Sequence, residues 1–326
     1  MEEAREALRL QPDNEENYAN LSDCYLSLDR LDEAEAVLKQ AADRKLESED
    51  LLSSRYVLAF LKGDTGEMER LAATAASKPL IEDFWRHQAF MEARQGRLRN
   101  ARELLTRPGF ICPHCLGLIE APFGDTQRAR TDAAAALKLS ENKTDPAFPA
   151  EALALAWAGD VAPAEELAHE MDKSFPLNTV LQRYWLPTIR AAVALHRKNA
   201  DKAVELLGVM SPHELGAPWL IPVYVRGQAY LMQGNGRTAA SDFQMIIDHP
   251  GLVRLAVVGV LAHLGLARAY ALQGDTTKAR AAYQDFLTLW KDADPDIPIL
   301  KEAKEEYAKL QLSTAVTLPL HDRASR

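Results

Sequence analysis

A short pattern recurs along this chain of 326 residues, and it limits the possible folds more than any other feature of the sequence. A turn-forming residue, usually Gly, precedes a small residue, usually Ala, by five positions. The clear copies are Gly96 with Ala101, Gly124 with Ala129, Gly159 with Ala164, Gly234 with Ala239, and Gly274 with Ala279. Weaker copies are Asp29 with Ala34, Gly63 with Met68, and Lys198 with Ala203. Successive markers lie 28 to 40 residues apart, a spacing typical of helical repeat arrays.

The pattern has a physical explanation. A helix commonly ends at a residue in the left-handed conformation, which Gly adopts without a Cβ clash. In four copies an Asp follows, and its carboxylate can accept from the free N–H groups that begin the next helix. These residues are Asp64, Asp125, Asp160 and Asp275. Each marker is therefore predicted to be the turn between the first and the second helix of an antiparallel hairpin.

The residues on both sides of the first marker have the spacing of two packed helices. Tyr18, Leu21 and Tyr25 recur at i, i+3 and i+7, which places them on one helical face. Ser22 before the turn and Ala34 after it are small enough to let the two axes approach closely. Only 7% of the residues are aromatic, and alanine is abundant, a composition that favours packed helices over sheets.

The clearest copies carry the residues of a known repeat motif at the expected positions. These residues are Tyr18, Leu21, Ser22, Tyr25, Ala34, Leu38, Ala41, Ala164 and Pro176. Through them the chain resembles the tetratricopeptide-repeat (TPR) family. The resemblance implies an all-α fold, a right-handed α-solenoid of about eight TPR helix hairpins with a C-terminal capping helix. The copies near Gly63, Gly96 and Lys198 lack several motif residues, which leaves their boundaries open.

The pattern divides the chain into four parts. Residues 1–12 are expected to be the second half of a truncated repeat, and residues 13–290 to be the TPR array. Prolines then interrupt the chain, so residues 291–311 are expected to form a Pro-containing turn and a capping helix. Residues 312–326 are expected to be a disordered tail. Because the first hairpin is incomplete, we expect this chain to be a fragment, or to begin at a start site inside a longer gene product.

The C-terminal part carries a second resemblance. The stretch from Tyr283 through Trp290 to Tyr307 is similar to the end of the TPR regions of bacterial serine/threonine kinases or winged-helix regulators. This resemblance implies a covalent N-terminal kinase or DNA-binding domain in the parent protein. The chain itself contains no Gly-rich phosphate loop and no HRD or DFG triplet, so a catalytic kinase domain is not expected within it.

Charge and hydropathy bear on the kind of partner. The chain has 38 basic and 47 acidic residues, a net charge of −9 and no dense basic run, so nucleic-acid binding is not expected. The most apolar window, residues 252–266, contains Arg254 and His263 and is too short to cross a bilayer. The N-terminus has charge where a signal peptide needs an apolar stretch. We expect a cytoplasmic chain, or an extracytoplasmic one if the parent has a transmembrane helix upstream.

A binding site is expected in the groove that the first helices of stacked hairpins form, because such a surface can hold a peptide. The candidate groove residues are Asn20, Asp23, Arg190 and Arg226, with solvated surface as the alternative role for each. Chaperone-binding TPR modules use a carboxylate clamp of Lys, Asn and Arg. The matching positions here hold Ala19 and Asp23, so capture of an acidic peptide C-terminus by that clamp is not expected.

The motif Cys112-Pro-His-Cys115 is the sharpest candidate for chemistry. A CxxC pair at a helix start can exchange disulfides, and this one resembles the active site of thioredoxin-like oxidoreductases. That chemistry needs a βαβ unit, whereas two small residues at a helix start are the alternative. No second CxxC or HxxxH completes a zinc site, so neither a metal nor a cofactor is expected. No His is paired with a nucleophile, and Trp157 and Trp219 are expected to be packing residues.

Four functions remain open at this point. The favoured one is a non-catalytic scaffold that binds a protein or peptide ligand, as the sensing or interaction arm of a larger bacterial regulator. The first alternative is a regulatory fragment of a serine/threonine kinase whose catalytic domain is absent here. The second is a thiol oxidoreductase that uses Cys112 and Cys115, and the third is a structural array that self-associates.

Overall fold

The computed structural model describes residues 1–77, 82–108, 110, 112–139, 148–216 and 218–315, and these ranges contain helices and turns but no β-strand. The α-helices are α1 (Glu2–Leu10), α2 (Glu15–Ser27), α3 (Leu31–Asp43), α4 (Glu49–Lys62), α5 (Thr65–Ala76), α6 (Glu82–Arg94), α7 (Leu98–Leu105), α8 (Pro113–Glu120), α9 (Thr126–Leu139), α10 (Phe148–Trp157), α11 (Val161–Ser174), α12 (Leu186–His196), α13 (Ala200–Leu207), α14 (Ile221–Met232), α15 (Gly236–Asp248), α16 (Pro250–Val253), α17 (Val258–Leu272), α18 (Thr276–Leu289) and α19 (Pro298–Ala315). Short 3₁₀ or π segments are η1 (Ala121–Phe123), η2 (Leu181–Trp185), η3 (Gly208–Gly216) and η4 (Pro218–Leu220).

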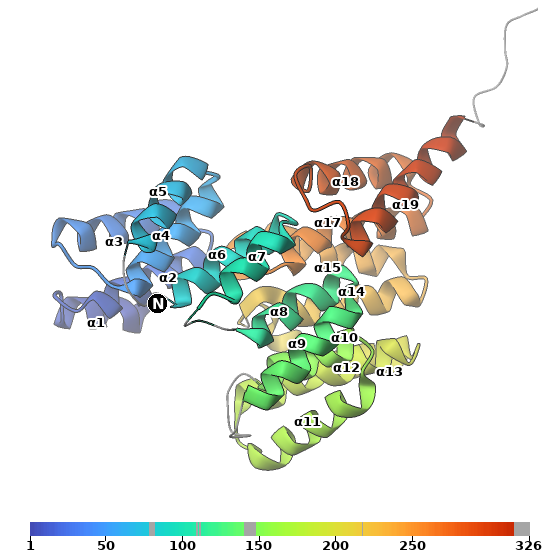
Figure 1. Cartoon of the computed structure of the whole chain (residues 1–326), viewed down its shortest axis with the longest axis horizontal. Helices are drawn as coiled ribbons and strands as arrows, with labels where there is room; N and C mark the ends of the chain where they lie inside the picture. Colours follow the sequence, from blue (N-terminus) through green and yellow to red (C-terminus); the bar gives the residue numbers. More distant parts are fainter. Residues whose placement is uncertain (78–81, 109, 111, 140–147, 217, 316–326) are drawn as a thin grey trace, which may run out of the picture.

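The helices pair in sequence order into antiparallel hairpins that stack on one another (Figure 1). In the described part of the chain the hairpins are α2/α3, α4/α5, α6/α7, α8/α9, α10/α11, α12/α13, α14/α15 and α17/α18. Helix α1 precedes them and α19 follows them. The prediction of an all-α array of about eight hairpins is confirmed.

Every predicted marker lies in the turn of one hairpin and has a left-handed backbone. The glycine markers have φ values between 70° and 86°, and the non-glycine markers Asp29 and Lys198 have φ values of 55° and 61°. The expected capping bonds form at Asp64, Asp125 and Asp275, whose carboxylates accept from the backbone N–H three residues on. Asp160 makes no such side-chain bond, because the residue three positions on is Pro163, which has no backbone N–H to donate.

Small residues at the helix contacts explain how closely the hairpins pack. Ser22 and Ala34, which were predicted to face each other across the first turn, are both 0% exposed. Farther along, the ring of Phe243 on α15 lies against Gly227 on α14 and Gly265 on α17. A Cβ atom added at either glycine would lie within 2.8 Å of this ring. Phe243 therefore fills space that only glycine leaves free.

The array curves until its two halves meet. Helix α17 passes behind α6 in Figure 1, and the short α16 contacts α2. The hydrophobic core of the described residues comprises an N-terminal cluster, which spans α2 to α6, a larger cluster that spans α6 to α19, and a small cluster of Ala121, Ala129 and Ala158. Leu255, from the connection between α15 and α17, is 4% exposed and belongs to the N-terminal cluster. This connection (residues 249–257) therefore joins the two halves.

A second contact closes the array at the turn between α6 and α7. The N–H of Asp294 donates to the carbonyl of Gly96 at 2.9 Å, and the indole of Trp290 donates to the carbonyl of Arg94 at 2.8 Å. A Cβ at Gly96 would lie 2.4 Å from the Cβ of Ala293. Gly96 is thus needed for its left-handed backbone and for the close approach of the segment before α19.

Helix α19 covers the end of the last hairpin. Leu300 and Ala303 are buried, and Tyr307 and Leu310 pack against the larger cluster, as their predicted common face requires. The helix continues to Ala315, past the predicted start of the tail at 312, and residues 316–326 of that tail lie outside the described residues. Within the described ranges, no helix is both long and apolar enough to cross a bilayer.

Candidate functional site

A cavity of about 500 Å³, which we call the apolar cavity, lies between first helices of the array and the connection between α15 and α17. Its apolar wall comes from the first helices of five hairpins (α6, α8, α10, α14 and α17) and from two connecting segments. The main contributors are Phe90, Leu118, Trp157, Trp219, Ile221 and Leu255. Arg86, His87 and Arg254 provide polar groups at its border. A cavity of this size with apolar walls and few polar groups has the usual form of a ligand site.

A second cavity, of about 320 Å³, adjoins the first, and we call it the acidic pocket. His87 and Arg254 line both cavities. The remaining charged residues of the acidic pocket are Glu16 and Asp23 on α2 and Asp50 on α4. Three carboxylates and one guanidinium thus line this pocket, and the two cavities form one groove with an apolar end and an acidic end.

Arg254 is held in place by several bonds to the N-terminal half. Its guanidinium donates to the carboxylate of Asp23 at 3.1 Å and to the hydroxyl of Ser27 at 3.0 Å. Its carbonyl accepts from the guanidinium of Arg94. Three residues earlier, the N–H of Gly251 donates to the carboxylate of Asp29 at 2.7 Å. These bonds fix the α15–α17 connection across the groove.

The backbone of this wall is strained. Arg254 has φ 52° and ψ −123°, and Trp219 and Leu220 have φ values of 71° and 51°. Such conformations cost about 1–3 kcal/mol each for residues other than glycine, and they persist where surrounding contacts hold them. Two of these residues, Trp219 and Arg254, line the apolar cavity.

His87 contributes an uncharged acceptor to the groove. Burial lowers its pKa to about 4, and the nearby charges of Arg86 and Arg254 add to this effect. Its Nδ1 lies 2.7 Å from the carbonyl of Asp83. Because a carbonyl can only accept, Nδ1 must carry the proton, and Nε2 of the neutral ring is then an acceptor.

The structure brings together only two of the four predicted groove residues. Asn20 and Asp23 both line the acidic pocket. Arg190 lines neither cavity of the groove, and its guanidinium pairs with Asp172 at 2.6 Å. Arg226 keeps 13% of its side chain exposed and lies between Asp242, at 2.7 Å, and Glu214. Burial alone would lower the pKa of Arg226, but hydrogen bonds with these carboxylates raise it overall.

His87 and Arg254 were not among the predicted groove residues, and Trp157 and Trp219 were predicted to be packing residues. Both tryptophans do pack against the larger cluster, but they also line the apolar cavity. One signal pointed to the α15–α17 connection. The markers on either side of it, Gly234 and Gly274, are 40 residues apart, the largest interval in the chain. The extra length forms α16 and the segment that crosses to α2.

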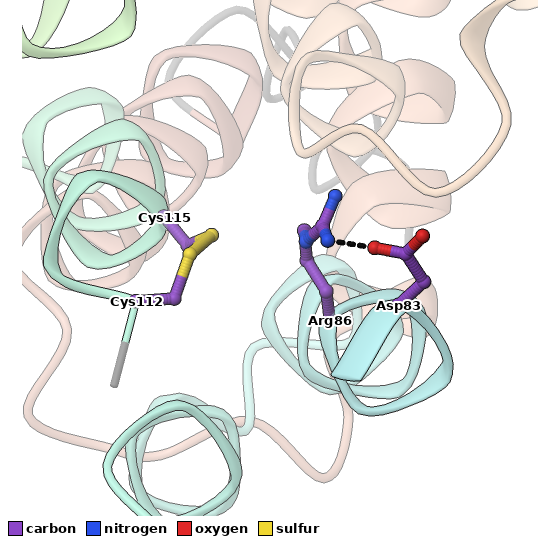
Figure 2. The surroundings of a disulfide bond; sticks show 4 residues. All are labelled: Asp83, Arg86, Cys112 and Cys115. Carbon is purple, nitrogen blue, oxygen red and sulfur yellow. Dashed lines mark hydrogen bonds and ion pairs between the residues drawn. A yellow bond between two sulfur atoms is a disulfide. The ribbon is translucent and has the colours of Figure 1, made fainter. Parts of the chain in front are cut away.

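The predicted redox pair forms a disulfide between Cys112 and Cys115 at the start of α8. Figure 2 shows this bond beside α6, where Arg86 is paired with Asp83. The two cysteines are 3% and 1% exposed, so a reducing thiol has little access to either sulfur. No group of three or more His, Cys, Asp or Glu residues that could hold a metal ion occurs in the described ranges.

A buried carboxyl lies at the C-terminal end of α8, and the disulfide lies at the opposite end of the helix. Glu120 is 3% exposed and contacts the guanidinium of Arg102, which also binds Asp132 at 3.1 Å. Burial raises the pKa of Glu120 to about 8, and a hydrogen bond with Asp132 adds to the shift. This group belongs to neither cavity, and it makes the stability of the array dependent on pH.

Comparison with known proteins supports the repeat assignment at the N-terminus. Residues 1–53 match the family model described as Tetratricopeptide repeat, and this region contains α1, the hairpin α2/α3 and the start of α4. The comparison with curated proteins gave no match. The matched part is thus similar to a TPR protein, and the hairpins that follow repeat its geometry along an all-α solenoid.

Proposed function

We propose that this chain is a binding scaffold that holds a protein or peptide segment in the groove and carries out no covalent step itself. The observation that supports the proposal is the groove, in which an apolar cavity of about 500 Å³ opens beside an acidic pocket on the first helices. TPR arrays present such concave surfaces to peptides. The preformed walls lower the entropy cost of binding, because Arg254 and the α15–α17 connection are already held in place.

The scaffold would act within a larger bacterial regulator, as its sensing or interaction arm. The support for this part is the similarity of residues 283–307 to the TPR regions of kinases and winged-helix regulators. A covalent kinase or DNA-binding domain in the parent would then receive the signal from the occupied groove. Expression of the parent gene product with and without a groove-blocking substitution tests whether the two parts are coupled.

Peptide selection tests the binding function directly. The full chain is immobilised, and a phage-displayed library of random peptides is selected against it. The variant Ala256→Trp fills the apolar cavity from a position on its wall, and Ala134→Trp places the same indole on the exposed surface of α9 as a control. We expect the selected peptides to bind the native chain and Ala134→Trp but not Ala256→Trp. Failure to select any peptide, or equal binding to all three proteins, would refute the proposal.

The disulfide supports one alternative function, thiol–disulfide exchange at Cys112 and Cys115. The burial of both sulfurs opposes it. Catalysis by the chain of insulin reduction, with dithiothreitol as the reductant and lost in Cys112→Ser, would favour this alternative. An inert disulfide would rule out thiol–disulfide exchange and leave binding as the one proposed function.

A further inference from the structure

The acidic pocket has an excess of negative charge that the protein does not neutralise. Asp23 is engaged, because its carboxylate accepts from Arg254 and from the hydroxyl of Ser54. Glu16 and Asp50 are exposed at the pocket and form no ion pair within the described ranges. Arg254 is the only cation that lines the described pocket, and its guanidinium is already bound to Asp23 and Ser27.

An unsatisfied hydroxyl gives a second, independent indication of a ligand. Ser53 lines the acidic pocket and is 6% exposed, and its Oγ has no hydrogen-bond partner among the described residues. A buried polar group without a partner costs about 1–3 kcal/mol. Such a group is expected to gain a bond when an occupant enters.

His87 extends this preference for a hydrogen-bond donor to the border with the apolar cavity. Its neutral ring holds a proton on Nδ1 through the bond to the carbonyl of Asp83, which leaves Nε2 as an acceptor. Carboxylates, a hydroxyl and an imidazole acceptor therefore surround the pocket. Lys and Arg side chains carry several donors and a positive charge, and they match this arrangement.

We propose that the acidic pocket receives a basic side chain, Lys or Arg, of a bound peptide whose neighbouring bulky apolar side chain enters the apolar cavity. The shared border at His87 and Arg254 places the two cavities within reach of one short segment. This inference rests on the proposed function, because it assumes that the groove holds a peptide. It names the chemistry of the ligand: an apolar anchor beside a positive charge.

The sequences from the peptide selection provide the first test. Peptides that bind the native chain and fail to bind Ala256→Trp should be enriched in Lys or Arg beside an aromatic or large aliphatic residue. If the selected peptides lack basic residues, the ligand chemistry is wrong although the groove still binds peptides. If no peptide is selected, both the binding function and the ligand chemistry fail.

The second test removes the charges on both sides of the contact. One selected peptide and its Lys/Arg→Gln counterpart are titrated into the native chain and into the double variant Glu16→Gln, Asp50→Asn. Each exposed carboxylate should contribute about two- to fivefold in affinity for the basic peptide, and salt should weaken that binding. Affinity for the Gln peptide should stay the same in both proteins, because its contact with the pocket carries no charge.

A matched control separates the pocket from the general acidity of the protein, whose net charge is −9. Glu69 is an exposed residue on the second helix α5, outside both cavities. The variant Glu69→Gln should bind the basic peptide as the native chain does. A loss of affinity in Glu69→Gln as large as that in the double variant would overturn the proposal.

Discussion

Gly251→Ala tests whether the contact between α16 and α2 holds the two halves of the array together. An added Cβ would lie 1.8 Å from the carbonyl oxygen of Leu26 and 2.8 Å from the carboxylate of Asp29. Since real Cβ contacts essentially never fall below 3.0 Å, α16 must move by at least the difference, about 1.2 Å. A movement of this size breaks the 2.7 Å bond from Gly251 to Asp29.

The expected cost follows from the bonds that are lost. A hydrogen bond to a charged group contributes about 1.5–3 kcal/mol, and the partly exposed pair of Arg254 with Asp23 contributes about 0–1 kcal/mol. We therefore expect Gly251→Ala to lower the free energy of unfolding by about 2–4 kcal/mol. Gly208→Ala is the matched control, because Gly208 has a helical backbone and no atom within 4 Å of an added Cβ. Both substitutions restrict the unfolded chain equally, so the difference between their unfolding free energies measures the cost of the clash.

Urea unfolding measures the free energy, and hydrogen exchange locates the change. A repeat array can open in parts, so exchange is followed at residues 21–29 and 250–256. In Gly251→Ala these segments should exchange faster while the hairpin α12/α13, which is remote from the contact, keeps its protection. If Gly251→Ala and Gly208→Ala unfold at the same urea concentration and exchange alike, the contact does not stabilise the array, and the reasoning from it is refuted.

Three further predictions concern the interior. Gly265→Ala places a Cβ 2.5 Å from the ring of Phe243 and should lower the free energy of unfolding, measured in urea, by about 1–3 kcal/mol. Gly66→Ala is the control, because the nearest atom to its added Cβ lies at 3.6 Å, and it should not lower that free energy. Equal losses of unfolding free energy in the two variants would contradict the packing described. Arg226→Met leaves Asp242 buried without its partner and should cost about 3–5 kcal/mol, whereas Arg190→Met at a half-exposed pair should cost under about 1 kcal/mol in the same assay. Because the pKa of Glu120 is raised in the folded chain, the folded chain keeps a proton that this carboxyl loses at lower pH in the unfolded chain, and the free energy of unfolding should fall as the pH rises from about 5 to 8. Glu120→Gln should flatten that part of the curve of unfolding free energy against pH. An unchanged slope would show that another group causes the fall.

The hairpins could be predicted because their signals are local. A left-handed residue at the end of one helix and a small residue five positions later are both fixed within a single turn, so the pattern identified Asp29 and Lys198 as well as the glycines. The buried faces of α2 and α3 followed from helical spacing for the same reason. Each of these features depends on residues that are neighbours in sequence.

The closure of the array could not be predicted in the same way. Gly251 and its partner Asp29 are 222 residues apart, and their meeting depends on the rotation between hairpins summed over the whole stack. A small difference in each rotation would move the two halves apart, and the sequence of one repeat does not specify this angle. The long interval between Gly234 and Gly274 shows extra residues, but it does not show where they go.

The predicted site residues show the same difference between features that neighbours in sequence determine and features that distant residues determine. Asn20 and Asp23 line the acidic pocket, on a helix face that follows from the repeat. Arg226 lies on a first helix too, yet Asp242 on the next helix approaches it within 2.7 Å and takes its charge out of the groove. Whether a charged side chain is free to meet a ligand depends on its neighbour across the hairpin, and the repeat motif does not determine that neighbour.

The α15–α17 connection gives the groove a wall that the repeats do not supply. The acidic pocket takes its carboxylates from α2 and α4, whereas its one described cation, Arg254, comes from the connection. Leu252 and Ala256 line the apolar cavity and also pack, half-buried, against the larger cluster. Leu255 lines the same cavity and is buried in the N-terminal cluster. Ligand choice and stability are therefore coupled at all three positions, through the larger cluster at Leu252 and Ala256 and through the N-terminal cluster at Leu255.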